Sequence, residues 1–439
     1  MITDNNKKLA QWAMDYALKN GCQAVKLVLY SDSNTSFDLR DAKMDKLQQA
    51  SESGLSMSLF VDGRFGYYST NRLDKKELEA FITNGIESTR YLAEDDARAL
   101  PDASRYYKGG KPDLQLFDNK IYTVNPDDKV AVARAAAEEV LGKDDRIISV
   151  GTSYNDGEKA VYRLTSNGFE GESKSTWFSL SADIAVKGEG EARPSSYWYE
   201  SALFYDKLPK SGIGAQALER VLKKLGQKKA ASGKYTMVVD PMNAGNLLDP
   251  VLSALYGESL QQKNSFLLDK LNTKVGADVL NLMDEPHIIG AKGARYFDSE
   301  GVATERRPIF EDGVLKTYFI DTYNSRKMGV APTINSPSLL VLKPGNKNID
   351  GLVADVQKGI LVTGFNGGNC NSSSGDFSYG IEGFLIENGK LTQPVNEMNV
   401  TGNMITLWAS LVAVGNDPRM SSSWRIPSLV FEGVDFSGL

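Results

Sequence analysis

The stretch QKKAASGKYTMVVDPMNAGNLLDPVLSALY (residues 227–256) predicts how the chain is organised. Its opening residues, 227–234, are polar or small, as is typical of a linker between domains. We therefore expect an N-terminal domain over residues 1–226 and a C-terminal domain over residues 235–439. A length of 439 residues agrees with two domains of ordinary size.

The second part of this stretch predicts a strand that leads into a helix over residues 243–260. Asp240 is a good N-cap, and Pro241 suits the first helical position. Leu248 and Leu252 would then share an apolar face. Because proline interrupts a regular helix, Pro250 indicates a kink or a new helical start.

The N-terminal part shows the order helix, antiparallel strands, helix twice, which suggests an internal structural repeat. In the first unit a helix ends near Gly21, an Asp62-Gly63 turn forms a hairpin, and strands are expected at 24–30, 36–40, 54–60 and 65–70, before a helix at 74–93. In the second unit Asn125-Pro126 begins a helix that ends near residue 141, strands are expected at 147–154, 160–166, 176–186 and 197–204, and a helix follows at 213–225. Asn155-Asp156-Gly157 is expected to be a turn between two of these strands.

The C-terminal part has many short strand-like runs separated by glycine turns, such as Glu311-Asp312-Gly313 and Glu387-Asn388-Gly389. This pattern favours an antiparallel sheet or a partly closed barrel. The fold class expected for the whole chain is α+β.

Charge and composition exclude several classes of protein. The 50 Lys and Arg residues against 56 Asp and Glu residues give a net charge of −6, so no basic field exists to bind nucleic acid. The first residues lack the pattern of a signal peptide, and no apolar run is long enough to span a membrane. Cys22 and Cys370 cannot form a disulfide framework. We expect a cytoplasmic protein without nucleic-acid or membrane partners.

Histidine chemistry is restricted to one residue, His287. A zinc site with two or three imidazoles is therefore excluded, and a catalytic triad would have to use this residue. His287 follows Asp284, Glu285 and Pro286, which indicates a turn before a short strand. We interpret it as a surface or hydrogen-bonded loop histidine.

Four ordered motifs carry a family resemblance: LLDPVLSALYGESLQQKNSFLLD (247–269), FDSEGVATERRPIFEDGVLKTY (297–318), SSGDFSYGIEGFLIENGKLTQPVNEMNVTGN (373–403) and VGNDP (414–418). They resemble the TldD/PmbA family, which is also known as modulator of DNA gyrase and is related to metallopeptidases. The resemblance covers most of the chain and is strongest from residue 238 to residue 418.

The resemblance also implies a branch of that family. TldD-like members carry His-Glu-x-x-x-His on this helix and a cysteine near the C-terminus, and they bind zinc, whereas PmbA-like members, also called TldE, lack that set and act as partners. In this chain the pattern falls on Asp249, Pro250 and Ala254. Only Asp249 could touch a metal, and no cysteine follows Ser421. The resemblance therefore implies no catalytic residue, no metal and no cofactor.

For the PmbA-like branch, the resemblance implies a non-catalytic subunit that forms a heterodimer with a zinc-bearing TldD-like chain and helps to enclose unfolded peptides. The candidate peptide-channel or signature positions are Tyr256, Cys370, Gly375, Asp376 and Phe377. Within the motif at residues 373–403, we interpret Gly375-Asp376 as a turn in which the Asp376 side chain hydrogen-bonds its own backbone.

Two alternatives remain open. The chain could act alone as a homodimeric peptide- or protein-binding module, or as an enzyme that uses Cys370 or a pair of carboxylates. Cys370 lies in the loop GGNCNSSSGDF, where no neighbouring cation is available to stabilise a thiolate.

The missing ligands lead to a prediction about metal content. The purified chain should carry no stoichiometric transition metal, because one carboxylate at Asp249 holds zinc too weakly to compete with water and buffer. Apolar packing from Leu252 and Leu255, or water, should fill the space. Elemental analysis after dialysis checks this, and about one zinc per chain would contradict the assignment to the PmbA-like branch.

Overall fold

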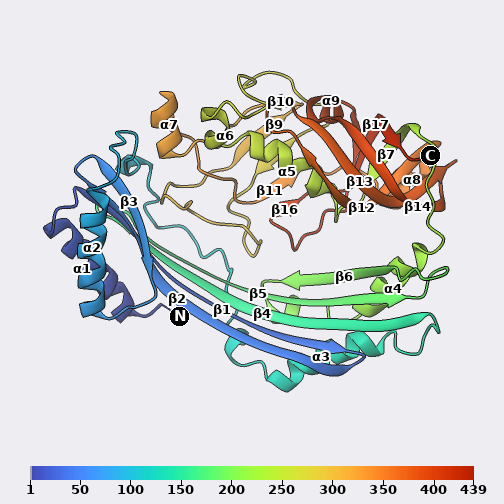
Figure 1. The fold of residues 1–439 in the computed structure, drawn as a ribbon, viewed down its shortest axis with the longest axis horizontal. Coiled ribbons are helices and arrows are strands. Elements are labelled where there is room, and N and C mark those ends of the chain that lie inside the picture. Colours follow the sequence, from blue (N-terminus) through green and yellow to red (C-terminus); the bar gives the residue numbers. More distant parts are fainter. Residues whose placement is uncertain (1) are drawn as a thin grey trace.

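The structure is a computed structural model that describes residues 2–439. Two parts face each other: a long curved sheet built from residues 24–202, and a β-rich part that begins at residue 233 and contains the C-terminus (Figure 1). The concave face of the long sheet is turned toward the β-rich part. None of the helices within residues 2–439 is long and apolar enough to cross a membrane.

The predicted repeat is confirmed. The first unit consists of α1 (Asp4–Lys19), β1 (Ala24–Arg40), β2 (Lys43–Val61), β3 (Arg64–Thr70) and α2 (Lys75–Thr89). The second unit consists of α3 (Pro126–Glu138), β4 (Ile147–Thr165), β5 (Glu170–Val186), β6 (Ser195–Ala202) and α4 (Ile213–Lys223). The strand order β3-β2-β1-β4-β5-β6 sets the units side by side, with β1 antiparallel to β4 at the centre.

Each unit has its own apolar core on the same face of this sheet. Leu27 of β1 and Leu164 of β4 lie with α1 and α2 in one core, and Leu39 of β1 and Val150 of β4 lie with α3 and α4 in the other. Because side chains alternate along a strand, residues 27 and 39 project to one side of the sheet. All four helices therefore cover one face and leave the other face to the C-terminal part.

The strands are longer than the sequence pattern indicated. The runs expected at 24–30 and 36–40 are parts of the single strand β1, and the turn expected at Asn155-Asp156-Gly157 is wrong, because these residues lie inside β4. Asp156 is buried there, 2.5 Å from the Lys129 ammonium, and accepts a hydrogen bond from the Tyr154 hydroxyl at 3.0 Å. A Cβ at residue 157 would lie 2.7 Å from the Trp177 indole nitrogen, so glycine serves close packing here.

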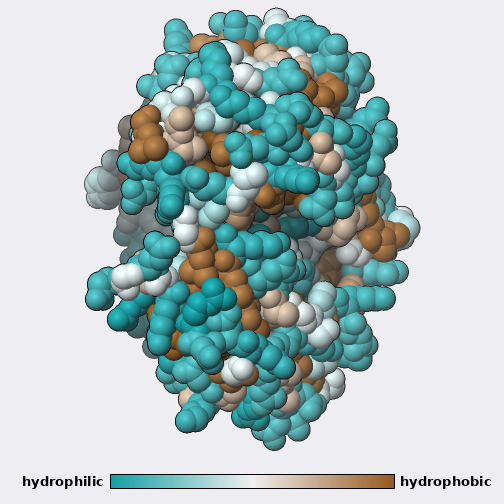
Figure 2. All heavy atoms as spheres, turned by 90° about the vertical axis from the view of Figure 1, so that its right-hand side faces the viewer, coloured by the Kyte–Doolittle hydropathy of each residue, from teal (hydrophilic) through white to brown (hydrophobic). Residues whose placement is uncertain are grey.

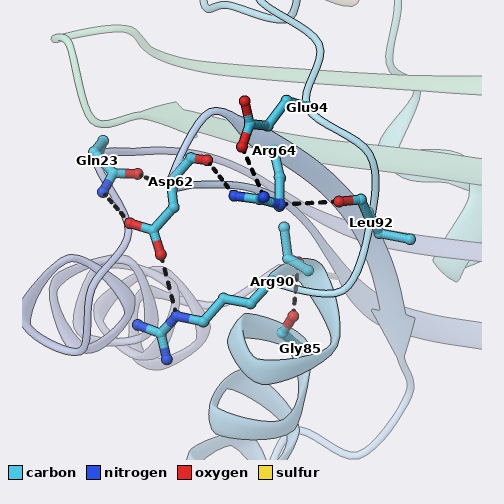
Figure 3. A network of polar contacts seen from close by, with 8 residues as sticks. Gln23, Asp62, Arg64, Gly85, Arg90, Leu92 and Glu94 are labelled. Atoms are coloured by element: carbon cyan, nitrogen blue, oxygen red, sulfur yellow. Dashed lines mark hydrogen bonds and ion pairs between the residues drawn. The ribbon is translucent and has the colours of Figure 1, made fainter.

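The predicted hairpin turn at Asp62-Gly63 is confirmed between β2 and β3, and a polar network holds it (Figure 3). The Gln23 amide pairs with Asp62, whose carboxylate also accepts a hydrogen bond from Arg90. Arg64 donates to the carbonyls of Asp62 and Leu92 and to the Glu94 carboxylate. The segment after α2 is thereby fixed to the edge of the sheet.

The C-terminal part contains a closed ring of strands. Its main elements are β7 (Gly233–Val239), α5 (Ala244–Ala254), α6 (Gly257–Gln261), β12 (Lys358–Cys370), β13 (Asp376–Glu387), β14 (Lys390–Asn403), α9 (Met404–Ala409), β15 (Leu411–Val414) and β17 (Leu429–Ser437). The order is β14-β13-β12-β7-β17-β15, and an additional pairing of β14 with β17 closes β14, β13, β12, β7 and β17 into a barrel. The expected sheet or partial barrel is confirmed, although β7 and β12 are parallel.

Short elements complete this part. A smaller sheet has the order β10-β9-β8-β11-β16. Its strands and the remaining helices are β8 (Leu282–Asp284), β9 (Arg307–Glu311), β10 (Val314–Leu315), α7 (Thr322–Met328), β11 (Leu340–Leu342), α8 (Ile349–Ala354) and β16 (Trp424–Arg425).

The residues interpreted as a linker are attached to the barrel. The Lys228 amide donates to the Pro394 carbonyl at 3.1 Å, and the Leu439 amide donates to the Ala230 carbonyl at 3.1 Å. Residues 227–232 are therefore hydrogen-bonded to the barrel and do not form a free linker between two domains. The division into residues 1–226 and 235–439 stays a prediction.

The helix after β7 differs in its limits from the expected one. Asp240 caps a turn by accepting the Asn243 amide at 2.9 Å, and α5 begins only at Ala244. It then continues through Pro250, so of the two alternatives expected at this proline, a kink or a new helical start, the new start is wrong. Burial of Leu248 and Leu252 against the barrel outweighs the hydrogen bond that proline removes.

The buried pair in β4 gives a stability prediction. Asp156→Ala should lower the free energy of unfolding by about 3–5 kcal/mol, because it leaves the Lys129 ammonium buried without its partner. The double variant Lys129→Met, Asp156→Leu should recover most of that loss. Urea denaturation measures both, and a loss below about 1 kcal/mol for the single variant would contradict the role of the ion pair.

Candidate functional site

The three degenerate-motif positions lie along α5, but they do not face one open site. Asp249 is exposed, Pro250 is half-buried, and Ala254 is 2% exposed. The Ala254 carbonyl accepts a hydrogen bond from the Ser265 hydroxyl at 2.6 Å, and its methyl group belongs to the barrel core. The second ligand position of the family pattern is thus filled by core packing.

The donor set does not fit zinc. Within residues 2–439, no group of three or more His, Cys, Asp or Glu side chains is arranged to hold a metal ion. Asp249 alone offers an oxygen at the motif, whereas zinc requires three or four ligands. Leu252 and Leu255 are buried as expected, and the space near Leu248 and Val251 is an apolar cavity of about 10 Å³. No catalytic step can therefore be derived through a metal held by this chain.

Two tyrosines lie near Asp249. Burial raises the pKa of Tyr379 to about 12, and the negative charge of Asp249 adds to this. Burial also raises the pKa of Tyr256; Arg295 opposes that shift and Asp249 reinforces it. Both phenols therefore stay protonated at neutral pH, and they are suited to hydrogen bonding rather than to proton abstraction.

Aromatic rings hold these tyrosines in place. The Tyr379 ring stacks on Phe377 at 5.4 Å between centroids and meets the edge of Phe365 at 5.7 Å, while Tyr256 lies 5.4 Å from Phe319. Phe377 is buried in the barrel core, so it acts as packing beneath Tyr379. Tyr379 was missed by the sequence reasoning, although it stands two residues after Phe377 and so shares its face of β13.

The turn before β13 contains Gly375 and Asp376, but its backbone amides are not bonded by the Asp376 side chain as expected. The Asn371 side chain accepts the amides of Ser373 and Ser374, at 2.9 and 3.1 Å, so Asn371 forms the turn. The Asp376 carboxylate accepts instead from the Ser374 hydroxyl at 2.7 Å and the Asn403 amide at 2.9 Å. Gly375 has φ +81°, which favours glycine, and its site faces the Phe266 ring.

Cys370 lies at the end of β12, half-buried, with its thiol 3.7 Å from the Asn371 carbonyl. Burial raises the pKa of this thiol, and the nearby Asp376 raises it further. Both effects disfavour a thiolate, which is the reactive form. The structure thus brings Cys370 close to Tyr379 and Asp376, and neither residue would stabilise a thiolate.

His287 is a hydrogen-bonded loop residue, as interpreted. Its Nε2 lies 3.0 Å from the Thr304 hydroxyl, and its ring lies 5.0 Å from that of Tyr296. Burial lowers its pKa, and the positive charge of Lys111 lowers it further. The short strand expected after it is wrong, because residues 286–290 form turns.

A cavity of about 1410 Å³ lies between the long sheet and the C-terminal part. Lys159 and Arg163 of β4, Trp177 of β5 and Tyr199 of β6 line one side, and residues of the segment 290–299 line the other. The surface seen from the right-hand side of Figure 1 is hollowed between the two parts (Figure 2). This cavity was not predicted from the sequence because its walls come from segments that are distant in the chain. The alternation of side chains along β4, which puts Lys159 and Arg163 on the face opposite the core, was the available signal.

The family comparisons agree with the motifs. Residues 25–89 match domain 1, residues 119–225 the central domain and residues 232–438 the C-terminal domain of PmbA/TldA metallopeptidases. The chain is 26% identical over 437 residues to a metalloprotease PmbA homolog of Haemophilus influenzae, covering 98% of this chain and 96% of the relative.

Solved structures share the fold. A protein of Bacteroides thetaiotaomicron, described as a candidate modulator of DNA gyrase, is 74% identical, with a TM-score of 0.99 and 100% of both chains covered. TldE of Thermococcus kodakarensis has a TM-score of 0.86 over 98% of this chain and 100% of that one, and its 18% identity shows a likeness of fold alone.

The environment of Cys370 gives a reactivity prediction. In a Cys22→Ser variant, iodoacetamide should alkylate Cys370 slowly at neutral pH, and the rate should still be rising above pH 9, because the raised pKa keeps the thiol protonated. The Cys22→Ser, Cys370→Ala double variant is the control for background. An alkylation rate that reaches its plateau near pH 7 would show that Cys370 is an activated thiolate and would favour the alternative of an enzyme that uses this cysteine.

Proposed function

The chain belongs to the PmbA/TldD metallopeptidase family, and we propose that it is a non-catalytic, TldE-like subunit of a cytoplasmic peptidase complex. Its partner in this proposal is a TldD-like chain that carries zinc. The substrates are unfolded peptides or small proteins, which the two chains enclose together.

The observation that carries the proposal is the state of α5. The helix packs Leu248 and Leu252 into the barrel core, but it offers Asp249, Pro250 and Ala254 where the resemblance implies zinc ligands and a base. Proline has no side-chain base and alanine has no donor atom, so hydrolysis needs residues from another chain. The raised pKa of Cys370 indicates that this thiol does not supply a nucleophile for hydrolysis either.

Peptide handling by this chain has a structural basis in the long sheet. β6 is an edge strand, and its Tyr199 and Ser201 line the cavity between the two parts. An extended peptide can add to such an edge, because main-chain hydrogen bonds accept varied side chains. The neutral phenols of Tyr256 and Tyr379 add donors near Asp249, without acid–base chemistry of their own.

The proposal predicts an activity that neither chain shows alone. Mixed with the TldD-like chain of the same organism, this protein should form a 1:1 complex in size-exclusion chromatography with light scattering, and the complex should cleave unfolded peptides. The isolated chain should show no turnover, since its motif lacks ligands and base. Cys370→Ala is the matched control, and the complex that contains it should cleave at the unchanged rate.

Two outcomes would contradict this function. Cleavage by the isolated chain that survives chelation of metal would favour the cysteine or carboxylate enzyme. A symmetric homodimer that ignores the TldD-like chain would favour the stand-alone binding module.

A further inference from the structure

The cavity between the sheet and the C-terminal part has a charge opposite to that of the chain. Ten charged side chains line it, of which seven are basic and three acidic, while the chain as a whole has a net charge of −6. The basic residues are Lys111, Lys159, Arg163, Lys174, Lys207, Lys292 and Arg295, and the acidic ones are Asp113, Glu172 and Asp298. Such a lining concentrates anions.

Arg163 differs from the other basic residues of this lining because its Nε is buried without a hydrogen-bond partner in the described chain. It lies on β4, opposite Val28 of β1 and Gly171 of β5. Within residues 2–439 no carboxylate lies within 4.0 Å of its guanidinium. A half-buried guanidinium with an unsatisfied Nε costs a fold free energy, and its position in the cavity lining leaves it available to a bound anion.

Arg295 is the second cation of this site and is fixed in position. Its Nε donates to the Ser338 hydroxyl at 2.9 Å, and its Nη2 donates to the Ser336 and Pro337 carbonyls at 2.7 and 3.1 Å. Arg163 and Arg295 line the same cavity. Burial lowers the pKa of Arg163, and the positive charge of Arg295 lowers it further. Four neutral acceptors, the Ser336 hydroxyl among them, orient Arg295 but do not neutralise it.

The nearest acid, Asp298, is already engaged. One of its oxygens accepts the amides of Glu300 and Val302, at 2.8 and 3.0 Å, and the other accepts the Asn335 amide at 3.2 Å. Its charge offsets part of that of Arg163 and Arg295, but its oxygens make no ion pair within 4.0 Å of either guanidinium in the described chain. The buried Asp284 likewise offsets part of the charge of Arg295 without an ion pair within 4.0 Å in the described chain, so both guanidinium groups line the cavity without a direct carboxylate partner.

We propose that Arg163 and Arg295 bind a carboxylate of a peptide held in this cavity. The planar guanidinium matches the two oxygens of a carboxylate, and such charge-assisted hydrogen bonds are stronger than neutral ones. The site deepens the proposed function, on which it rests, by giving this subunit a preference for acidic peptides. The carboxylate can be an Asp or Glu side chain or the free C-terminus of the peptide.

The test measures peptide binding to the full chain by isothermal titration calorimetry at fixed salt. The probes are a flexible twelve-residue peptide with a central Glu and an amidated C-terminus, its Glu→Gln counterpart with the same amide, and that Gln peptide with a free C-terminus. Arg163→Gln should weaken binding of the carboxylate peptides by about 10-fold or more, as expected for loss of a charged hydrogen-bond pair. The fully neutral peptide should bind the variant and the parent equally.

Two controls separate binding from folding. Arg134→Gln removes the same charge from α3, where Arg134 is exposed and contacts the Ala42 carbonyl, and it should leave all affinities unchanged. The melting temperature of Arg163→Gln should equal or exceed that of the parent, because the substitution breaks no internal ion pair. The Glu peptide and the free C-terminus peptide distinguish the two sources of the carboxylate.

Equal affinity of parent and Arg163→Gln for the carboxylate peptides, or no binding of any peptide up to millimolar concentration, would overturn the site. These results are independent of complex formation. A chain that pairs with its TldD-like partner but shows no Arg163 effect keeps the proposed function and loses the site. A chain that discriminates the peptides but does not pair keeps the site and loses the function.

Discussion

The antiparallel pairing of β1 with β4 is the contact on which the rest of the structure depends. It runs without a break from Lys26 opposite Thr165 to Arg40 opposite Gly151, and so joins two helix–strand–helix units into one sheet. Because both pairs of helices cover the same face, the opposite face is free to form the wall of a cavity. Without this pairing each unit would be a three-stranded sheet with an exposed inner edge, which is prone to aggregate.

Much of this fold could be predicted from local patterns. Caps, helical spacing and the Asp62-Gly63 turn predicted the repeat, and glycine turns predicted the β-rich C-terminal part. The errors came from residues whose partners are distant in sequence. Asn155-Asp156-Gly157 has the composition of a turn, but Lys129 pairs with Asp156 and Trp177 packs on Gly157, so a strand forms. The closure of the barrel by β14 and β17 likewise leaves no local signal.

The candidate site divides in the same way. The motif positions Asp249, Pro250 and Ala254 could be found from the sequence because they lie within six residues of one helix, and the comparisons agree on the family. The presence of Arg163 and Arg295 in one cavity could not be predicted from the sequence, because Arg163 lies on β4 and Arg295 lies in a loop of the C-terminal part. Both sites agree with the proposed role, in which this chain contributes a peptide-facing scaffold and a partner contributes the hydrolytic chemistry.

The central claim is that this chain adds shape but no metal chemistry to a two-chain peptidase. The most direct test is the zinc content of the purified 1:1 complex with its TldD-like partner, measured by elemental analysis against protein mass. The account predicts one zinc per pair of chains, since only the partner offers a ligand set and Asp249 stands alone. Two zinc ions per pair, with one lost on Asp249→Ala, would contradict it.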